Sequence, residues 1–382
     1  MTAPATPPPP PQAPFKRFHT PGFACYSLAF SPFYPGKLAV AGSANFGLVG
    51  NGRLSILGQD GGGGGGMGGR LGLDKGFDTQ DGLYDLAWSE CHENQIATAS
   101  GDGSVKLWDV MLNDYPIRKW HEHQREVFSI DWSNVQKELF CTSSWDGSIK
   151  IWTPDRAHSL TTIPAHTSCV YAALFSPATP SLIASCSSDG SLKIWDTRSP
   201  LPSPSPSPSG PALATPQLAL AAHPGAEVLD LDWNKYDANV LATGSVDRTI
   251  RVHDLRRASS SPLPPTTAPT TTAPHLEPNA TVATLLGHEY AVRRVQWSPH
   301  SASRLVSGSY DMTARIWSVA PPSSLMSPTG MATARFGTGG VNARMERVWD
   351  RHSEFVVGVG WSLYEEGEVG SCGWDGEVHL WR

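Results

Sequence analysis

Histidine, serine or threonine, and aspartate recur together along the chain, and these are the residue types of a general base, a nucleophile and the acid that orients the base. In the clearest instance they are His123, Thr142 and Asp146, followed by Trp152 six residues after the aspartate. A hydrolase needs one such set. Three further sets have the same spacing: His166, Ser185, Asp189 and Trp195; His288, Ser307, Asp311 and Trp317; and His352, Ser371, Asp375 and Trp381.

The repetition with a tryptophan indicates a structural role for these residues. Within one unit the aspartate can accept hydrogen bonds from the histidine and from backbone amides, and the hydroxyl can bridge histidine and tryptophan. The indole N–H then has a partner while its ring is buried. Because a catalytic set has no reason to recur several times, we interpret these residues as a network that holds each repeat together. We therefore expect no enzyme activity.

Other candidate sites for chemistry are weak. His121 and His123 would share one face of a strand, but no third metal ligand is near them. The run GGGGGGMGGR, residues 61–70, lacks the Gly-Lys-Ser/Thr of a phosphate-binding loop. The six cysteines form no CxxC pair and mostly lie in strand-like segments, where a thiol acts as a small apolar group. The sequence predicts no metal and no cofactor.

Charge and hydropathy narrow the class of partner. The chain has a formal net charge of −6, with acids and bases mixed along it, so it lacks the basic patch that nucleic acid requires. We find no basic-then-apolar leader and no run of about 18 apolar residues, so we expect no direct membrane insertion. The free cysteines favour a reducing, intracellular compartment.

The elements that position the recurring residues are short strands. Within residues 123–152 the runs VFSIDW, ELFCTS and IKIW alternate apolar and polar residues, and a WDGS turn precedes the third run. Two partial copies lie around Trp88 and Trp233, and a divergent seventh copy spans residues 25–57. Seven copies predict an all-β fold in which seven blades form a ring, a seven-bladed β-propeller.

The ends of the chain and four long connections complete the expected domain organisation. Residues 1–14 are proline-rich, and we expect them to be a disordered tail before a single propeller at 15–382. The last repeat ends one strand short of a four-stranded blade, so we expect Phe15–His19 to join it and close the ring. Glycine-, proline- and serine-rich composition predicts flexible insertions near 58–76, 198–219, 256–283 and 318–344.

The positions at which the copies differ are the candidates for recognition. By register, the residue before each turn aspartate and the residues three and five after each repeat histidine point to one rim of the ring. The turn positions are Trp145, Tyr310 and Trp374, and the strand positions are Glu126, Phe128, Tyr171, Glu227, Phe355 and, in the second copy, Tyr84. Leu229, Arg293 and Val357 take the strand position in the remaining copies. Aromatic anchors with a few acids suit an amphipathic segment with apolar and basic residues.

Three segments carry a resemblance to a known family. They are TPGFACYSLAFSPFYPGKLAVAGSANFGLVGNGRLSIL (20–57), EVFSIDWSNVQKELFCTSSWDGSIKIW (126–152) and HSEFVVGVGWSLYEEGEVGSCGWDGEVHLW (352–381). They resemble WD-repeat receptors for the type 2 peroxisomal targeting signal, the seventh-peroxin family. The first segment is the most specific, because FGLVGNGRLSIL replaces the usual GSxDGxxxxW. The likeness spans nearly the whole chain apart from the insertions and the tail.

The resemblance implies a soluble import receptor in the cytoplasm that shuttles to the matrix side of the peroxisome. Such a receptor binds an N-terminal helical signal on matrix proteins, basic at its start and apolar along one face, with a later His or Gln. It works with a co-receptor peroxin and delivers cargo to the peroxisomal docking complex. These expectations agree with the aromatic and acidic residues at the candidate rim.

Two other functions stay open at this point. WDTR at Trp195–Arg198 and HDLR at His253–Arg256 look like the paired Asp-x-Arg sequences with which WD-repeat adaptors dock on cullin ubiquitin ligases. Asp-x-Arg is also common after this strand in WD repeats generally. A generic scaffold is the remaining alternative.

Overall fold

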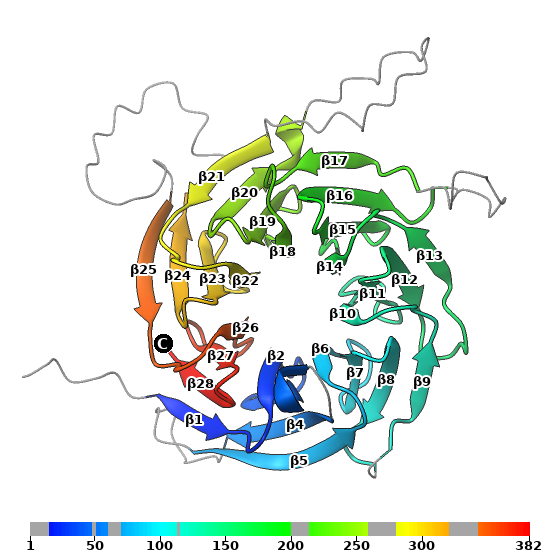
Figure 1. The fold of residues 1–382 in the computed structure, drawn as a ribbon, viewed down its shortest axis with the longest axis vertical. Coiled ribbons are helices and arrows are strands. Elements are labelled where there is room, and N and C mark those ends of the chain that lie inside the picture. Colours follow the sequence, from blue (N-terminus) through cyan, green and yellow to red (C-terminus); the bar gives the residue numbers. More distant parts are fainter. Residues whose placement is uncertain are drawn as a thin grey trace, which may run out of the picture.

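The computed structural model describes residues 15–47, 51–59, 70–112, 115–199, 214–258, 280–320 and 343–382. These residues form seven four-stranded antiparallel sheets, which stand as blades around a central axis (Figure 1). The predicted seven-bladed propeller is confirmed. Within the described ranges the helices are limited to two short 3-10 turns, η1 (Ala44–Gly47) and η2 (Leu255–Arg257), and neither has the length or hydropathy to cross a membrane.

The first four blades follow one another directly along the chain. Blade 1 contains β2 (Ala24–Phe30), β3 (Lys37–Ser43), β4 (Gly52–Gln59) and β5 (Leu71–Thr79). Blade 2 contains β6 (Leu83–Trp88), β7 (Gln95–Ser100), β8 (Ser104–Asp109) and β9 (Arg118–His121). Blade 3 contains β10 (Val127–Trp132), β11 (Phe140–Ser144), β12 (Ser148–Trp152) and β13 (Thr161–Pro164). Blade 4 contains β14 (Val170–Phe175), β15 (Leu182–Ser187), β16 (Ser191–Asp196) and β17 (Leu218–Ala221).

The last three blades include the one in which the ring closes. Blade 5 contains β18 (Val228–Trp233), β19 (Val240–Ser245), β20 (Ile250–Asp254) and β21 (Thr281–Leu285). Blade 6 contains β22 (Val292–Trp297), β23 (Arg304–Ser309), β24 (Ala314–Val319) and β25 (Ala343–Trp349). Blade 7 contains β26 (Val356–Trp361), β27 (Val369–Gly373), β28 (Glu377–Trp381) and, as its outer strand, β1 (Lys16–His19).

The N-terminal strand closes the ring, as the sequence predicts. β1 pairs antiparallel with β28, from Lys16 opposite Leu380 to His19 opposite Glu377. Phe15, just before the strand, packs edge-on against Trp349 with ring centroids 5.0 Å apart. Both ends of the chain therefore belong to one sheet, and β28 has no open edge.

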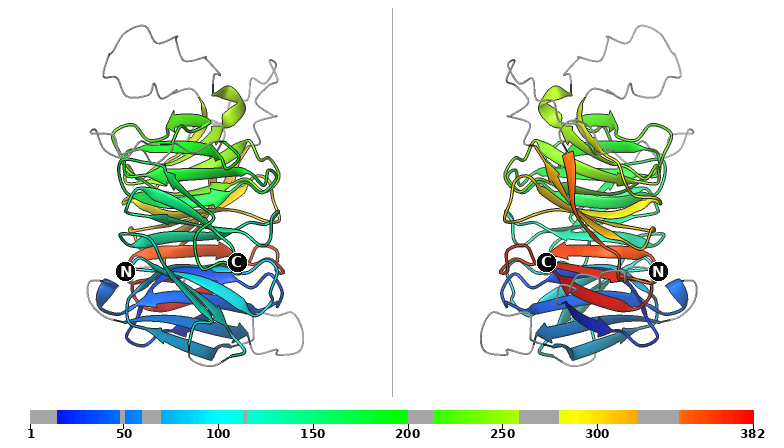
Figure 2. Two further views of the ribbon diagram at one scale, coloured as in Figure 1. Left: turned by 90° about the vertical axis from the view of Figure 1, so that its right-hand side faces the viewer. Right: turned by 90° about the vertical axis from the view of Figure 1, so that its left-hand side faces the viewer.

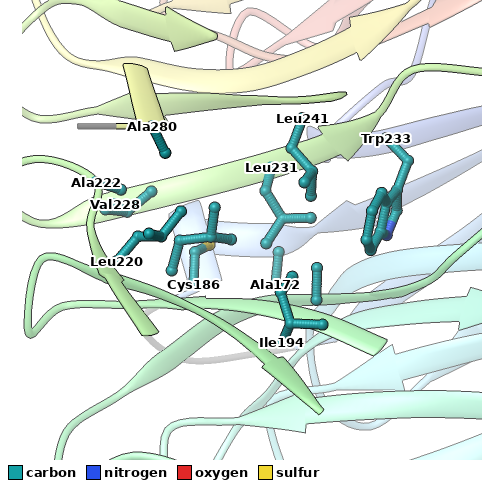
Figure 3. Packing of buried hydrophobic residues seen from close by; sticks show 12 residues of the cluster. Ala172, Cys186, Ile194, Leu220, Ala222, Val228, Leu231, Trp233, Leu241 and Ala280 are labelled. Carbon is teal, nitrogen blue, oxygen red and sulfur yellow. The ribbon is translucent and has the colours of Figure 1, made fainter. Parts of the chain in front are cut away.

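Apolar side chains fill the spaces between neighbouring blades. In Figure 3, Ala172, Cys186 and Ile194 of blade 4 face Val228 and Leu231 of blade 5 across one such space. Alternation along each strand supplies one apolar row to each side, which explains why most residues of the three inner strands of each blade are buried, whereas the outer strands are largely exposed or half-buried. Each blade thus depends on its neighbours for its core.

Aspartates link the inner strands of neighbouring blades. Asp131 accepts a hydrogen bond from the backbone N–H of Phe175, at 2.8 Å, and Asp232 accepts one from Trp297, at 2.7 Å. Both aspartates border a cavity of about 270 Å³ in the central channel, which Lys235 also lines. Burial, with the charges of Asp232 and Asp85, raises the pKa of Asp131 to about 7, while Lys235 acts in the opposite direction.

Replacement of Asp131 by asparagine is expected to stabilise the protein at pH 8. A carboxyl whose folded pKa is raised costs stability progressively as the pH rises from about 4 to about 7, and that cost persists above pH 7. Asparagine keeps an acceptor for the Phe175 amide without the charge. We expect Asp131→Asn to raise the free energy of unfolding by about 1–3 kcal/mol at pH 8 and by little at pH 4.5. Urea unfolding at both pH values, with exposed Asp155→Asn as control, measures this difference.

The expected insertions and tail lie mostly outside the described residues. Residues 1–14, 60–69, 200–213, 259–279 and 321–342 fall there, and the last four ranges each separate the third and fourth strands of a blade. The expected bounds were too wide, because their ends are strand: 58–59 belong to β4, 71–76 to β5, 218–219 to β17, 281–283 to β21, 318–319 to β24 and 343–344 to β25. Ladder pairing with the neighbouring strand, such as Leu57 with Leu73, supplies the order that local composition does not show.

Candidate functional site

The recurring histidine, hydroxyl, aspartate and tryptophan residues form one hydrogen-bonded chain inside each regular blade. In blade 3, Nδ1 of His123 lies 2.9 Å from Oδ2 of Asp146, and Nε2 lies 2.8 Å from Oγ1 of Thr142. The indole N–H of Trp152 donates to the same hydroxyl at 2.9 Å. The corresponding distances in the sets that begin at His166, His288 and His352 lie between 2.7 and 3.1 Å.

Burial makes these networks unsuited to catalysis. The hydroxyls of Thr142, Ser185, Ser307 and Ser371 belong to residues with no exposed surface, so a substrate cannot reach them. Both ring nitrogens of His123 are already engaged, which also leaves this residue unable to share a metal with exposed His121. The arrangement therefore stabilises the blades and leaves recognition to other residues.

Every inner strand carries a β-bulge at the same place, and the seven bulged residues surround the central opening. A bulge inserts one residue and re-aims its side chain. The bulges lie between Cys25 and Ser27 in blade 1, between Val127 and Ser129 in blade 3, and at the equivalent register shifts in the other five blades. We call the bulged residues the axial ring: Tyr26, Tyr84, Phe128, Tyr171, Leu229, Arg293 and Val357.

Aromatic side chains of the axial ring join those of the turns in a continuous aromatic belt. Phe128 stacks on Trp145 at 4.9 Å between ring centroids, and Tyr84 lies 5.0 Å from Phe128. On the other side, Trp374 lies 5.2 Å from Phe355 and 6.3 Å from Tyr310. The belt comprises Tyr171, Trp145, Phe128, Tyr84, Tyr26, Trp374, Phe355 and Tyr310.

Seven of the eight belt residues are among those that the sequence predicts, and Tyr26 is the one that it missed. Tyr26 lies 5.2 Å from Tyr84 and 5.7 Å from Trp374, so it joins the two halves of the belt. Blade 1 lacks the repeat histidine and the turn aspartate from which the register is counted. Aligning its strand ACYSLAF with VFSIDW would have placed Tyr26 beside Phe128 in register.

The two predicted acids lie at the edge of the belt. Glu227 accepts a hydrogen bond from the hydroxyl of Tyr171, at 2.8 Å, and Glu126 lies 3.6 Å from the exposed guanidinium of Arg125. Burial, followed by the charge of Glu126, raises the pKa of Tyr84. Burial and the hydrogen bond with Glu227 raise the pKa of Tyr171. Both acids are only half-buried and keep acceptor capacity for a basic ligand.

A hollow of about 440 Å³ extends the belt over blades 5 to 7. Its walls include Tyr290, Tyr310, Met312 and Phe355, and Tyr290 is 61% exposed. Met312, like Arg248 nearby, has a positive φ, at a turn position that is glycine in blades 2, 3, 4 and 7. A side chain at such a φ is strained, and strain of this kind concentrates at functional sites. Tyr310 and Phe355 are predicted from the sequence, but Tyr290 and Met312 are not, although a long residue after the turn aspartate would have indicated Met312.

The belt and the hollow lie on one face of the ring. This turn face carries the connection between the second and third strands of each blade, where Trp145, Tyr310 and Trp374 lie. η1 occupies the same connection in blade 1 and projects from the face in the edge-on views (Figure 2). Because strands alternate in direction, the ends of the third strands, from which the long insertions leave, lie on the opposite face.

The two Asp-x-Arg sequences lie away from the belt and pair internally. Arg198 contacts Asp196 at 2.6 Å, and Arg256 contacts Asp254 at 2.8 Å and Asp237 at 2.9 Å. Each arginine is therefore held by carboxylates of its own blade.

Comparisons with known proteins agree with the fold. The WD40 family, described as WD domain, G-beta repeat, matches residues 75–109, 114–153, 157–196, 214–254 and 279–318. The chain is 38% identical to the peroxisomal targeting signal 2 receptor of Saccharomyces cerevisiae, over 96% of this chain and 99% of that protein. It is 39% identical to the receptor of that name from Komagataella phaffii, over 96% and 98%, and 34% identical to the one from Mus musculus, over 96% of each.

Proposed function

The chain belongs to the family of peroxisomal targeting signal 2 receptors, and we propose that its turn face binds the signal of peroxisomal matrix proteins directly. The ligand in this proposal is an N-terminal helix that is basic at its start and apolar along one face. A co-receptor completes the site, and the complex is delivered from the cytoplasm to the peroxisomal docking complex.

The continuous aromatic belt bordered by two acids is the observation that supports this proposal. A helix presents its apolar residues as a stripe along one side, and the belt offers a matching row of half-buried rings. Glu126 lies close to Trp145 in the chain fold, since the backbone N–H of Trp145 donates to the carbonyl of Glu126. A basic residue of the ligand can therefore reach the carboxylate while a neighbouring apolar residue contacts the indole.

Apolar contact contributes more to this binding than charge does. An exposed ion pair contributes about 0.2–1 kcal/mol, whereas truncation of a central aromatic residue at an interface costs about 2 kcal/mol or more. We therefore expect a fairly weak complex of receptor and signal alone. Burial of the second side of the helix by a co-receptor would supply the remaining apolar area.

Combined replacement of Trp145 by alanine and Glu126 by lysine is expected to weaken signal binding about 100-fold. The alanine removes the ring that stacks on Phe128, and the lysine repels the basic end of the ligand. Fluorescence anisotropy of a labelled type 2 signal peptide, titrated with receptor and co-receptor, measures the change.

A double variant on the opposite face is the matched control. Tyr236→Ala with Glu138→Lys changes an exposed aromatic and an exposed acid in the connections between first and second strands. It should bind the peptide as the unmodified protein does. Equal affinity of the Trp145/Glu126 variant and this control would place the signal elsewhere.

A further inference from the structure

Arg293 is the one charged residue of the axial ring. The other six members are aromatic or aliphatic: Tyr26, Tyr84, Phe128, Tyr171, Leu229 and Val357. Arg293 lies on β22, and its guanidinium carbon is 5.0 Å from the ring centroid of Phe128 on β10. β22 and β10 lie on different sides of the central opening (Figure 1), so the side chain reaches across it.

Arg293 is buried and forms no ion pair within 4.0 Å among the described residues, although its charge acts on Asp230 from further away. It is 6% exposed, and its one hydrogen bond to the described part of the chain runs from Nη1 to the carbonyl of Leu229, at 3.2 Å. No carboxylate of the described residues lies within 4.0 Å of it. The other buried cations in the described ranges have one: Lys106 lies 3.8 Å from Asp102, and Lys150 lies 3.4 Å from Glu122.

The neighbouring Arg294 shows that this lack of an ion pair is particular to position 293. Arg294 lies one residue further along β22 and contacts two carboxylates, Asp85 at 2.7 Å and Asp230 at 3.7 Å. At 293 the fold supplies one carbonyl and one aromatic face, which leave most of the five guanidinium N–H donors unused. None of the guanidinium nitrogens of Arg293 is among the fully enclosed side-chain atoms that lack a hydrogen bond, so its free donors reach the central opening and are available to a partner from outside the chain.

The surroundings of Arg293 define the chemistry of that partner. A guanidinium fork matches the two oxygens of a carboxylate. A doubly charged phosphate group is disfavoured as the ligand, because Arg293 supplies a single cation, and Glu126 and Glu227 on the same face would repel the phosphate. Burial raises the pKa of Tyr26 and of Tyr171, and the charge of Arg293 opposes the rise at both rings, which places this charge among apolar side chains. The residues that flank this carboxylate in the ligand must therefore be apolar.

We propose that Arg293 is the receptor for a carboxylate, an Asp or Glu side chain flanked by apolar residues, which the targeting segment of the cargo places over the central opening. This inference rests on the proposed function. The turn face then binds charges of both signs on its ligand. Glu126 and Glu227 bind basic residues at the edge, and Arg293 binds one acid at the centre.

A double-mutant cycle tests the pairing. The labelled signal peptide of a type 2 cargo is prepared with each Asp or Glu replaced in turn by Asn or Gln, and its binding to unmodified receptor and to Arg293→Met is measured by anisotropy with co-receptor present. We expect one replacement to weaken binding to the unmodified receptor about 10- to 100-fold and to change nothing further in the variant. If no replacement couples to Arg293, the proposal is wrong.

A small probe tests the site without cargo. 4-Phenylbutyrate offers an aromatic ring with a carboxylate, and 4-phenylbutanamide is its neutral counterpart. We expect the acid, and not the amide, to quench tryptophan fluorescence saturably, and Arg293→Met to abolish the effect. Binding of acid and amide alike would overturn the proposal. If the acid binds through Arg293 but no signal peptide binds, the carboxylate site stands and the proposed function fails.

Thermal melting separates this role from a structural one. If Arg293 served the fold, Arg293→Met would melt at a lower temperature. As an unpaired buried charge, it should give a variant that melts at the same temperature or higher without ligand. Arg156→Met removes an exposed arginine at the outside of blade 3 and serves as the control for both binding and melting.

Discussion

Deletion of residues 1–20 is expected to lower the melting temperature by about 6 °C or more and to cause aggregation. The deletion removes β1, and with it Phe18, which packs in the core between blades 7 and 1, and Phe15 against Trp349. It also removes Thr20, whose hydroxyl donates to the carbonyl of Gly376 at 3.0 Å. Two aromatic side chains with a strand ladder amount to roughly 5 kcal/mol, which corresponds to about 6–8 °C for a chain of this size.

Loss of β1 also leaves β28 as an open edge. Val378 and Leu380 of β28 have no exposed surface in the closed ring, and an uncovered apolar edge strand pairs with other chains. Deletion of residues 1–13 is the control, because it ends before Phe15 and should leave the melting curve unchanged. Scanning calorimetry with light scattering measures both effects, and coincident curves for the two deletions would contradict a ring-closing role of β1.

The fold could be predicted because its determinants are local and repeated. Alternation and the turn before Ser148 define three strands in residues 123–152, and the same spacing recurs along the chain. The fourth strand of each blade was not visible in this way. β5 illustrates the reason, since LGLDKGFDT contains two glycines and reads as a loop, yet Phe77 pairs with Leu54 and is buried between blades. Pairing with a neighbouring strand determines whether such a segment is a strand, and the composition of the segment does not show this pairing.

The positions of the candidate site could be predicted from the sequence, but the orientation of the side chains at the bulges could not. Counting from the repeat histidine places Phe128, Tyr171 and Arg293 at equivalent positions, but alternation alone does not tell which of two neighbouring residues points to the axis. The bulge settles this, and it arises from packing of the inner strands around a closed ring. Tyr26 was missed for a related reason, because blade 1 offers no histidine from which to count.

The stability of the protein is expected to collapse in acid. Burial lowers the pKa of His123, His166 and His288, and it lowers the pKa of His253 and His379 to about 3. Such a histidine stays neutral in the folded state while the unfolded chain takes up a proton below about pH 6.5. His253 and His379 therefore each remove about 1.4 kcal/mol per pH unit as the pH falls below that value, and His123, His166 and His288 act in the same direction.

Other groups decide where the collapse occurs. Raised pKa values of Asp131, about 7, and Asp230, about 6, act in the opposite direction between pH 7 and 4, because the folded state binds these protons first. Below pH 4 this opposition ends, since the unfolded acids are also protonated. There the turn aspartates add to the loss, because hydrogen bonds, above all with the repeat histidine, hold the pKa of Asp146, and of its counterparts, well below the usual value. We expect complete unfolding before pH 3.

His253 offers the sharpest single-site measurement of this linkage. It occupies the position of the blade tryptophan, is 1% exposed, and its Nε2 lies 2.9 Å from the hydroxyl of Thr243, which His223 also contacts. Glutamine retains a donor for that hydroxyl and cannot titrate. In urea unfolding at pH 7, 6 and 5, His253→Gln should reduce the dependence of unfolding free energy on pH by up to about 1.4 kcal/mol per unit. His121→Gln, which removes an exposed imidazole, should leave the dependence unchanged, and equal slopes for all three proteins would show that buried histidine does not control the acid transition.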